Sequence, residues 1–297
     1  MYNKFYGFTE PPFNITPNSR FFYQSAKHTE ALSTMIYAIE QRKGFVVITG
    51  DIGSGKTTVC RALLHQLGSH VETAMITNTH IVSGKELLSM ILDDLEIEHS
   101  GSSKSRLLSQ LNQYLIEQLR KDKNVVLIVD EAQNLSPSVL EEIRMLSNLE
   151  TEYEKLIQII FLGQPELKKK LALPRLEQLR QRIAVFFHLS PLTEEDARNY
   201  IRHRLKTASG SDRQFFTDTA IKSIYHFSKG VPRLINQICD SALLHGYVEG
   251  LELIDERMMQ DVISASPQTL IAQSPQHKKH DDDVLTSSIS FGDALSL

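Results

Sequence analysis

A glycine-rich run between an apolar segment and an amphipathic one limits how this chain of 297 residues can fold. Residues 50–57 are Gly-Asp-Ile-Gly-Ser-Gly-Lys-Thr, which satisfies the pattern G-x-x-x-x-G-K-S/T. Glycines let successive backbone N–H groups converge on phosphate oxygens, and a helix that follows directs its positive N-terminal end at the same anion. The run therefore predicts a site for the phosphates of a nucleotide.

Each position of this run has an expected role. The predicted nucleotide-binding residues are Gly50, Asp51, Ile52, Gly53, Ser54, Gly55, Lys56, Thr57 and Thr58. Lys56 is expected to reach the β- and γ-phosphates, and the Thr57 hydroxyl is expected to ligate Mg²⁺. A chance match in a glycine-containing turn is the alternative, but the strand predicted before the run and the helix predicted after it argue against chance. We expect ATP and Mg²⁺ as the ligands.

Two adjacent carboxylates follow a second apolar segment. Residues 125–129 are Val-Val-Leu-Ile-Val, and Asp130 and Glu131 come next. A strand beside the one that precedes the glycine run would place Asp130 at the carboxyl edge of the sheet, next to Mg²⁺. Glu131 would then polarise the attacking water, which predicts hydrolysis rather than binding alone. The alternative is an acidic N-cap of the next helix, which explains two acids after five buried residues less well.

Alternating apolar strands and amphipathic helices predict an α/β fold with a parallel sheet covered on both faces. Strands are predicted over residues 45–49, 73–77, 125–129 and 156–162, and helices over residues 25–42, 56–67, 84–95, 106–120 and 138–148. No apolar strand is predicted beyond residue 189, where helices are expected over residues 194–208, 218–228, 232–249 and 255–264. We expect an N-terminal arm (1–24), an α/β nucleotide-binding domain (25–188), a small helical domain (189–265) and a disordered tail (266–297).

The first 24 residues are rich in aromatic residues and proline. Their prolines lead us to exclude a regular helix, and the aromatic content is too high for a solvated tail. The favoured interpretation is an arm packed on the surface of a domain. The alternative places some of these aromatic side chains around an adenine ring.

Composition restricts the partners and the cellular location that we expect for the protein. A formal net charge of −4 gives no global reason to expect nucleic acid as a partner, although residues 168–170 are three lysines that leave a local DNA contact open. The two cysteines do not form a CxxC motif, which favours a reducing compartment. No apolar run approaches the roughly 18 residues of a membrane span, and the N-terminus lacks a signal peptide. We expect a cytoplasmic protein without a transmembrane segment.

Four further polar residues are candidates with two interpretations each. Gln164 follows the strand predicted over residues 156–162 and either orients the hydrolytic water or occupies a turn before Pro165. Arg180 and Arg182 lie on a predicted short helix and either face solvent or reach the γ-phosphate of a neighbouring subunit. Arg233 opens a predicted helix and either lies on its surface or bends back over the nucleotide.

Several blocks together resemble the AAA+ ATPases of the general secretion pathway protein A type, over residues 1–264. The blocks are the aromatic residues 6–13, Gly44-Phe45, residues 130–135 (Asp-Glu-Ala-Gln-Asn-Leu), residues 163–167 (Gly-Gln-Pro-Glu-Leu), residues 179–183 (Leu-Arg-Gln-Arg-Ile) and residues 230–236 (Gly-Val-Pro-Arg-Leu-Ile-Asn). The run at residues 51–52 is Asp-Ile where Glu-Val is common in the family, a change that backbone-mediated binding should tolerate.

The resemblance implies a P-loop NTPase (AAA+) sheet followed by a helical lid. It also implies Gln164 at the sensor 1 position, Arg233 as sensor 2, and Arg182 or Arg180 as an arginine finger that acts between subunits of a homo-oligomer. The polar tail is similar to the short, stand-alone form found with pilus or exopolysaccharide export systems. The expected function is an ATPase that drives or regulates assembly of a secretion, pilus or export apparatus with a protein partner, and the alternative is an ATP-dependent DNA-binding regulator of transposition.

Overall fold

The sheet is built from strands with apolar side chains on both faces. β1 (Phe45–Gly50), β3 (Asn124–Val129) and β4 (Gln158–Gly163) are buried along their whole length. β2 (Val71–Ile76) and β5 (Ile183–Leu189) lie at the two edges. The order is β2-β3-β4-β1-β5 and every pairing is parallel, which confirms the predicted parallel α/β sheet.

Helices cover both faces of the sheet in this computed structural model, which describes residues 1–14, 18–77, 79–99 and 103–269. Side chains alternate along each strand, so Val46 and Ile48 face one layer of helices while Phe45 and Val47 face the other. The first layer is α2 (Ala26–Glu40) and α3 (Lys56–Gln66). The second layer comprises α4 (Gly84–Asp94), α5 (Lys104–Arg120), α6 (Pro137–Leu146), α7 (Pro165–Leu171) and α8 (Glu177–Gln181).

The edge strand β5 is an element that the sequence analysis does not predict. Its burial alternates along the strand until Leu189, which is fully buried. A search for continuous apolar runs finds strands buried on both faces and misses one that is covered on a single face. β5 pairs with β1 so that Leu189 lies opposite Gly50, at the start of the glycine loop.

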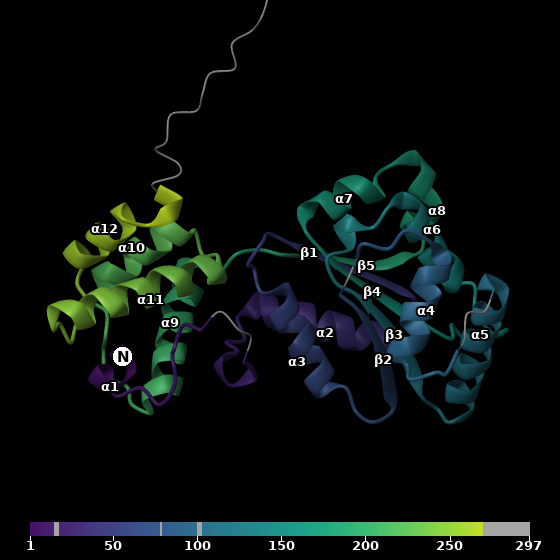
Figure 1. Ribbon diagram of the computed structural model, residues 1–297, viewed down its shortest axis with the longest axis horizontal. Coiled ribbons are helices and arrows are strands. Elements are labelled where there is room, and N and C mark those ends of the chain that lie inside the picture. Colours follow the sequence, from purple (N-terminus) through teal and green to yellow (C-terminus); the bar gives the residue numbers. More distant parts are fainter. Residues whose placement is uncertain (15–17, 78, 100–102, 270–297) are drawn as a thin grey trace, which may run out of the picture.

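A second group of elements, here called the helical group, lies beside the sheet (Figure 1). It consists of α9 (Glu194–Ser209), α10 (Asp218–Ser228), α11 (Pro232–Glu249) and α12 (Glu256–Ser264), which share one hydrophobic core. Side-chain caps from Thr193, Thr217 and Asp255 begin α9, α10 and α12. Beyond residue 269 the predicted disordered tail lies outside the described residues. Among the described residues, no helix combines the length and apolar character needed to span a bilayer.

The N-terminal segment departs from its prediction in two ways. Tyr2–Tyr6 forms a short helix, α1, so the exclusion of a helix is wrong here, because these residues precede the first proline of the segment. Four of its aromatic side chains are also buried more deeply than those of an arm on a domain surface would be. The buried rings of Tyr6, Phe8, Phe13 and Phe21 belong to the core of the helical group. Figure 1 shows α1 lying with that group, far from the sheet.

Candidate nucleotide site

The loop between β1 and α3 has the backbone geometry of an anion-binding turn. Gly53 and Gly55 have φ of 79° and 101°, a region that favours glycine. A Cβ on Gly53 would lie 2.5 Å from the Cβ of Arg233, so a side chain there would displace α11. Gly55 is the N-cap of α3, and the first N–H groups of that helix are therefore available to an anion.

The Lys56 side chain spans the loop. Its ammonium donates hydrogen bonds to the carbonyl oxygens of Gly50 at 2.8 Å and Asp51 at 3.0 Å. Burial lowers the pKa of Lys56, while the charges of Glu131, Asp130 and Asp51 oppose that shift. The amine is thus held at the mouth of the loop, where the run of residues 50–57 predicts phosphate oxygens.

Two oxygen ligands suited to Mg²⁺ lie next to each other. The Thr57 hydroxyl donates a hydrogen bond to Oδ2 of Asp130 at 3.0 Å. The prediction that β3 lies directly beside β1 is wrong, because β4 is inserted between them. Asp130 still reaches this edge, since the carboxyl ends of parallel strands share one edge of a sheet. Within the described part of the chain, no group of three or more His, Cys, Asp or Glu side chains forms a metal cage. One hydroxyl and one carboxylate fit Mg²⁺, which commonly completes its octahedron with phosphate oxygens and water.

Glu131 lies beside these ligands, in an uncommon backbone conformation with φ of 53°. Its Oε2 accepts a hydrogen bond from Nε2 of Gln164 at 3.1 Å and another from Nε2 of Gln133 at 2.5 Å. Gln164 reaches this position because β4, which it follows, pairs with β3. The structure therefore brings Gln164 to Glu131. It also places Gln133 at this carboxylate, a residue that belongs to the family block at residues 130–135 but was not predicted as a site residue.

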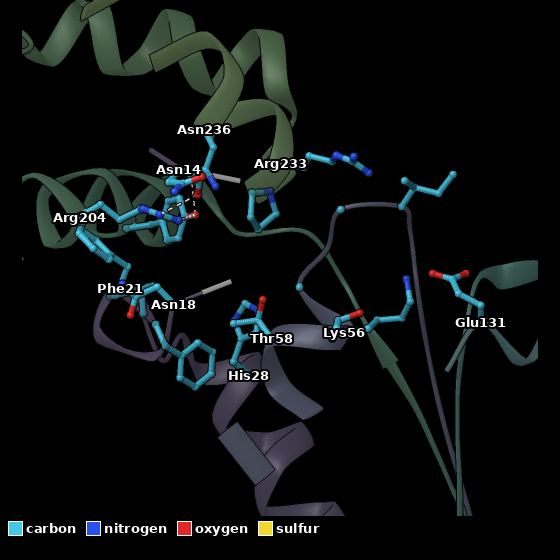
Figure 2. A pocket seen from close by; sticks show the side chains of 18 residues that line it. Asn14, Asn18, Phe21, His28, Lys56, Thr58, Glu131, Arg204, Arg233 and Asn236 are labelled. Atoms are coloured by element: carbon cyan, nitrogen blue, oxygen red, sulfur yellow. Dashed lines mark hydrogen bonds between the residues drawn. The ribbon is translucent and has the colours of Figure 1, made fainter. Parts of the chain in front are cut away.

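A cavity of about 260 Å³ runs from the glycine loop to the helical group (Figure 2). Most of the predicted binding residues line it, namely Ile52, Gly53, Gly55, Lys56, Thr57, Thr58 and Arg233, whereas Gly50, Asp51 and Ser54 do not. The predicted catalytic residue Glu131 lines it as well. The wall also includes Asn236, from the block at residues 230–236, and residues that no motif marks, namely Asn14, Asn18, Phe21, Phe22, Tyr23, His28, Tyr200 and Arg204. Figure 2 shows Lys56 and Glu131 at one end, Phe21 and Arg204 at the other, and His28 between them.

Arg204 organises the far end of this cavity. Its guanidinium is buried and donates to the carbonyl oxygens of Pro12 at 2.5 Å and Asn14 at 3.2 Å, and to the Tyr200 hydroxyl at 2.7 Å. Tyr200 in turn donates to Oδ1 of Asn236 at 2.8 Å. One cation thus ties the N-terminal segment to α9 and α11. The sequence alone carries no signal for this arrangement, since its partners are mostly backbone atoms.

His28 connects the N-terminal segment to the glycine loop. Its Nδ1 lies 2.6 Å from the Ser25 hydroxyl, which caps α2. Burial lowers its pKa, and a hydrogen bond with the backbone of Ser54 opposes that shift. A Cβ on Gly55 would lie 2.9 Å from Nε2, so the ring packs directly against the loop.

The three candidate arginines differ in where they lie. Arg233 lines the cavity, and its backbone N–H donates to the Gly53 carbonyl at 3.3 Å. Arg182 contacts the Arg144 carbonyl and the Ser147 hydroxyl, at the end of α6. Arg180 donates to the carbonyls at the end of α7. Neither Arg180 nor Arg182 lines this cavity.

Comparison with known proteins agrees with the predicted family. The AAA domain family matches residues 39–171. Over 84% of this chain, the sequence is 43% identical to general secretion pathway protein A of Aeromonas hydrophila. The resemblance to the AAA+ ATPases of this type is confirmed. The matched region spans less than half of that relative's own length, 46%. A second relative, an uncharacterized HTH-type transcriptional regulator of Methanocaldococcus jannaschii, is 26% identical over 51% of this chain, and the match covers 37% of its length.

Solved structures support the AAA+ fold class at much lower identity. Cdc6p from Pyrobaculum aerophilum has a TM-score of 0.66 and 17% identity, over 89% of this chain and 74% of that one. The ORC2 protein of Aeropyrum pernix has a TM-score of 0.63 and 14% identity, over 90% of this chain and 75% of that one. These likenesses show the fold alone, a P-loop sheet followed by helices, as the sequence predicts.

Proposed function

We propose that this AAA+ ATPase hydrolyses ATP with Mg²⁺, and that the cycle drives or regulates assembly of a secretion, pilus or exopolysaccharide export apparatus. The observation that carries the hydrolysis proposal is the placement of Thr57, Asp130, Glu131 and Gln164 around one point beside the glycine loop. A protein that only bound nucleotide would have no need for Glu131 next to the expected γ-phosphate.

In the proposed reaction, each residue at the carboxyl edge of the sheet has a separate role. The Glu131 carboxylate accepts a proton from water while the water oxygen bonds to the γ-phosphorus and the bond to the β,γ-bridging oxygen breaks. Lys56 offsets the negative charge that gathers on the phosphate oxygens. Mg²⁺, held by Thr57 and Asp130, would supply further charge neutralisation. Gln164 donates to Glu131 and would orient the water.

The purine base would lie at the far end of the cavity. Phe21, Phe22 and Tyr23 supply aromatic surface there. This favours the alternative interpretation of the N-terminal aromatic residues for these three rings. Arg233, from the start of α11, would reach the phosphates from the helical group.

The assembly role and the oligomer rest on separate observations. The name of the Aeromonas relative supports a protein partner in a secretion system. A cytoplasmic location remains part of the proposal, and the free, buried thiols of Cys60 and Cys239 support a reducing compartment. The resemblance to this family supports Arg182 or Arg180 as the finger of a homo-oligomer, a role compatible with their position outside this cavity.

Substitution of Glu131 tests the hydrolysis proposal. Glu131→Gln should keep ATP affinity and lower turnover by about 100-fold or more, because the amide cannot accept the proton of the water. Binding is measured with a fluorescent ATP analogue and turnover by phosphate release. Wild-type turnover retained in Glu131→Gln, or absent from the unmodified chain at every concentration, would overturn the proposal.

A protein concentration series tests the shared site. Turnover per subunit should rise with concentration, and Arg182→Ala or Arg180→Ala should lose that rise without losing ATP affinity. Flat turnover in the unmodified chain would exclude a finger between subunits. The same series with duplex DNA tests the alternative function, since DNA stimulation that weakens with salt would favour a DNA-binding regulator.

A further inference from the structure

Gln133 uses both halves of its carboxamide at the candidate catalytic edge. Its Nε2 donates to Oε2 of Glu131 at 2.5 Å. Its Oε1 accepts the backbone N–H of Gln164 at 3.0 Å. One side chain therefore connects the end of β3 to the end of β4, the two strands whose tips carry the proposed water-activating and water-orienting residues.

The turn that carries Gln133 is itself held in place. Residues Ala132–Asn134 form a short 3-10 helix directly after Glu131. The Lys170 ammonium, from α7, donates to the carbonyl oxygens of Gln133 and Leu135. A Cβ on Gly163 would lie 3.0 Å from Oε1 of Gln133, so the glycine lets the amide approach the end of β4. The bridge thus sits on a turn anchored from a separate helix.

Glu131 needs such support because of its backbone. With φ of 53°, it lies in the left-handed region that side-chain-bearing residues seldom adopt, and surrounding contacts must maintain that conformation. Gln133 and Gln164 both donate to Oε2. The water is therefore expected at Oε1, and the orientation of the carboxylate depends on the two amides.

We propose that Gln133 is a positioning residue, which fixes the Glu131 carboxylate relative to the end of β4 so that one oxygen is presented to the attacking water. The proposal rests on the hydrolysis proposed above, and it adds a residue that acts through Glu131 without touching ATP. Loss of the bridge would leave nucleotide binding intact and would slow the chemical step.

Two substitutions separate the halves of the bridge. Gln133→Met keeps the length of the side chain and removes both polar groups. Gln133→Glu keeps an acceptor for the Gln164 N–H and replaces the donor to Glu131 by a second carboxylate. Asn134→Leu is the matched control, because this neighbour lies in the same turn and its amide donates to the Thr79 hydroxyl instead of Glu131. All three are compared with Glu131→Gln in ATP affinity, turnover and thermal unfolding.

Gln133→Met should lower kcat about tenfold or more, as expected for loss of a hydrogen bond to a charged group, with ATP affinity within about twofold of the unmodified chain. Asn134→Leu should change neither. Unchanged turnover in Gln133→Met would overturn the proposal. Increased turnover would also overturn it, because the bridge would then restrain Glu131 instead of presenting it.

The pH dependence of Gln133→Glu gives a readout that a purely structural role would not move. The Glu131 charge should raise the pKa of the introduced carboxyl, which can donate only when protonated. Lys56, Asp130 and Lys170 also face this region, so turnover is measured as a ratio to the unmodified chain, and the ratio for Gln133→Met, which introduces no charge, is the reference. The ratio should be larger at about pH 6 than at about pH 8 for Gln133→Glu, and flat for Gln133→Met. A flat ratio for Gln133→Glu would contradict the donor role.

The outcomes for the two proposals are distinguishable. Retained turnover in Glu131→Gln would sink the proposed function and this inference together. A dead Glu131→Gln with a fully active Gln133→Met would sink only the inference. If Gln133→Met does not fold, which thermal unfolding reports, Gln133→Glu alone still decides through its pH ratio.

Discussion

The glycine loop at the proposed phosphate end of the cavity comes from one short stretch of chain, whereas the far end is assembled from segments 192 positions apart, as the Arg204–Pro12 contact shows. In the proposed mode of binding, the glycines and backbone N–H groups of this loop would hold the phosphates, so the consecutive residues 50–57 carry the signal. At the far end, side chains from the N-terminal segment, α9 and α11 must meet. Local backbone geometry leaves a signature in sequence, and long-range side-chain contact does not.

The two ends should therefore respond differently to substitution. Damage at the phosphate end should abolish binding without unfolding the protein, since that loop adds little to the core. Damage at the far end should weaken the fold as well, because residues of the N-terminal segment belong to the core of the helical group.

The largest expected effect is at the phosphate end. Lys56→Ala should lower ATP affinity by about 100-fold or more, because charge-assisted hydrogen bonds to the phosphates are lost. The free energy of unfolding should fall by less than about 2 kcal/mol, because the Gly50 and Asp51 carbonyls lose their donor beside a cavity from which water can replace it. Titration with a fluorescent ATP analogue and urea unfolding measure the two quantities, and retained affinity would show that this loop does not hold the phosphates.

Substitution of Arg204 tests whether residues at the far end of the cavity stabilise the fold as well as bind the ligand. Arg204→Met should lower the free energy of unfolding by about 2–4 kcal/mol, because the carbonyls of Pro12 and Asn14 lose their buried donor. Urea unfolding measures this effect. Lys206→Met on the same helix removes an exposed ion pair with Asp212 and should shift stability by less than about 0.5 kcal/mol. Equal effects of the two variants would mean that Arg204 does not hold the segment.

A smaller effect is expected from the aromatic wall. Phe22 lines the cavity, and its ring packs edge-on against His28 with centroids 5.9 Å apart. Phe22→Ala should weaken ATP affinity by about three- to tenfold, in line with one aromatic contact, with a smaller loss for inorganic triphosphate. Tyr153→Ala, at a ring that is 89% exposed, is the control. Equal losses for ATP and triphosphate would place the base elsewhere.

The smallest effect concerns pH. Burial lowers the pKa of His28 below its ordinary value of 6.5, so the unfolded chain binds this proton more readily than the folded one. The contribution of the neutral ring to stability is therefore complete above about pH 6.5 and decreases as pH falls below it. The charge of Asp196 opposes this lowering of the His28 pKa. Burial also lowers the pKa of His203, which therefore contributes a pH dependence of stability with the same sign.

His28→Gln should accordingly reduce the drop in Tm between about pH 7.5 and about pH 5.5. Thermal unfolding at the two pH values measures the drop, and His65→Gln, at a histidine outside the cavity, provides the comparison. If Tm drops equally in the unmodified chain and in His28→Gln, protonation of His28 does not contribute to the pH dependence of stability.

The carboxyl edge of the sheet, which carries the candidate catalytic residues, is intermediate between the glycine loop and the far end of the cavity in how far sequence predicts it. The sequence predicted Asp130, Glu131 and Gln164 separately, because each follows an apolar strand and parallel strands share one edge. The distances among them depend on β4 lying between β1 and β3, which no local pattern specifies. The bridge from Gln133 depends on the same strand order, and Arg180 and Arg182 stay predictions because their proposed target is on another subunit.

By itself, the sequence determined the α/β class, the phosphate loop, the acidic pair and most helix boundaries, since periodicity, caps and glycine conformations are encoded within a few consecutive residues. Only the tertiary structure decided that the N-terminal rings enter the core of the helical group, that β5 closes the sheet beside Gly50, and that Arg204 and His28 line the cavity. These features arise from contacts between segments far apart in the chain, where packing outweighs local preference.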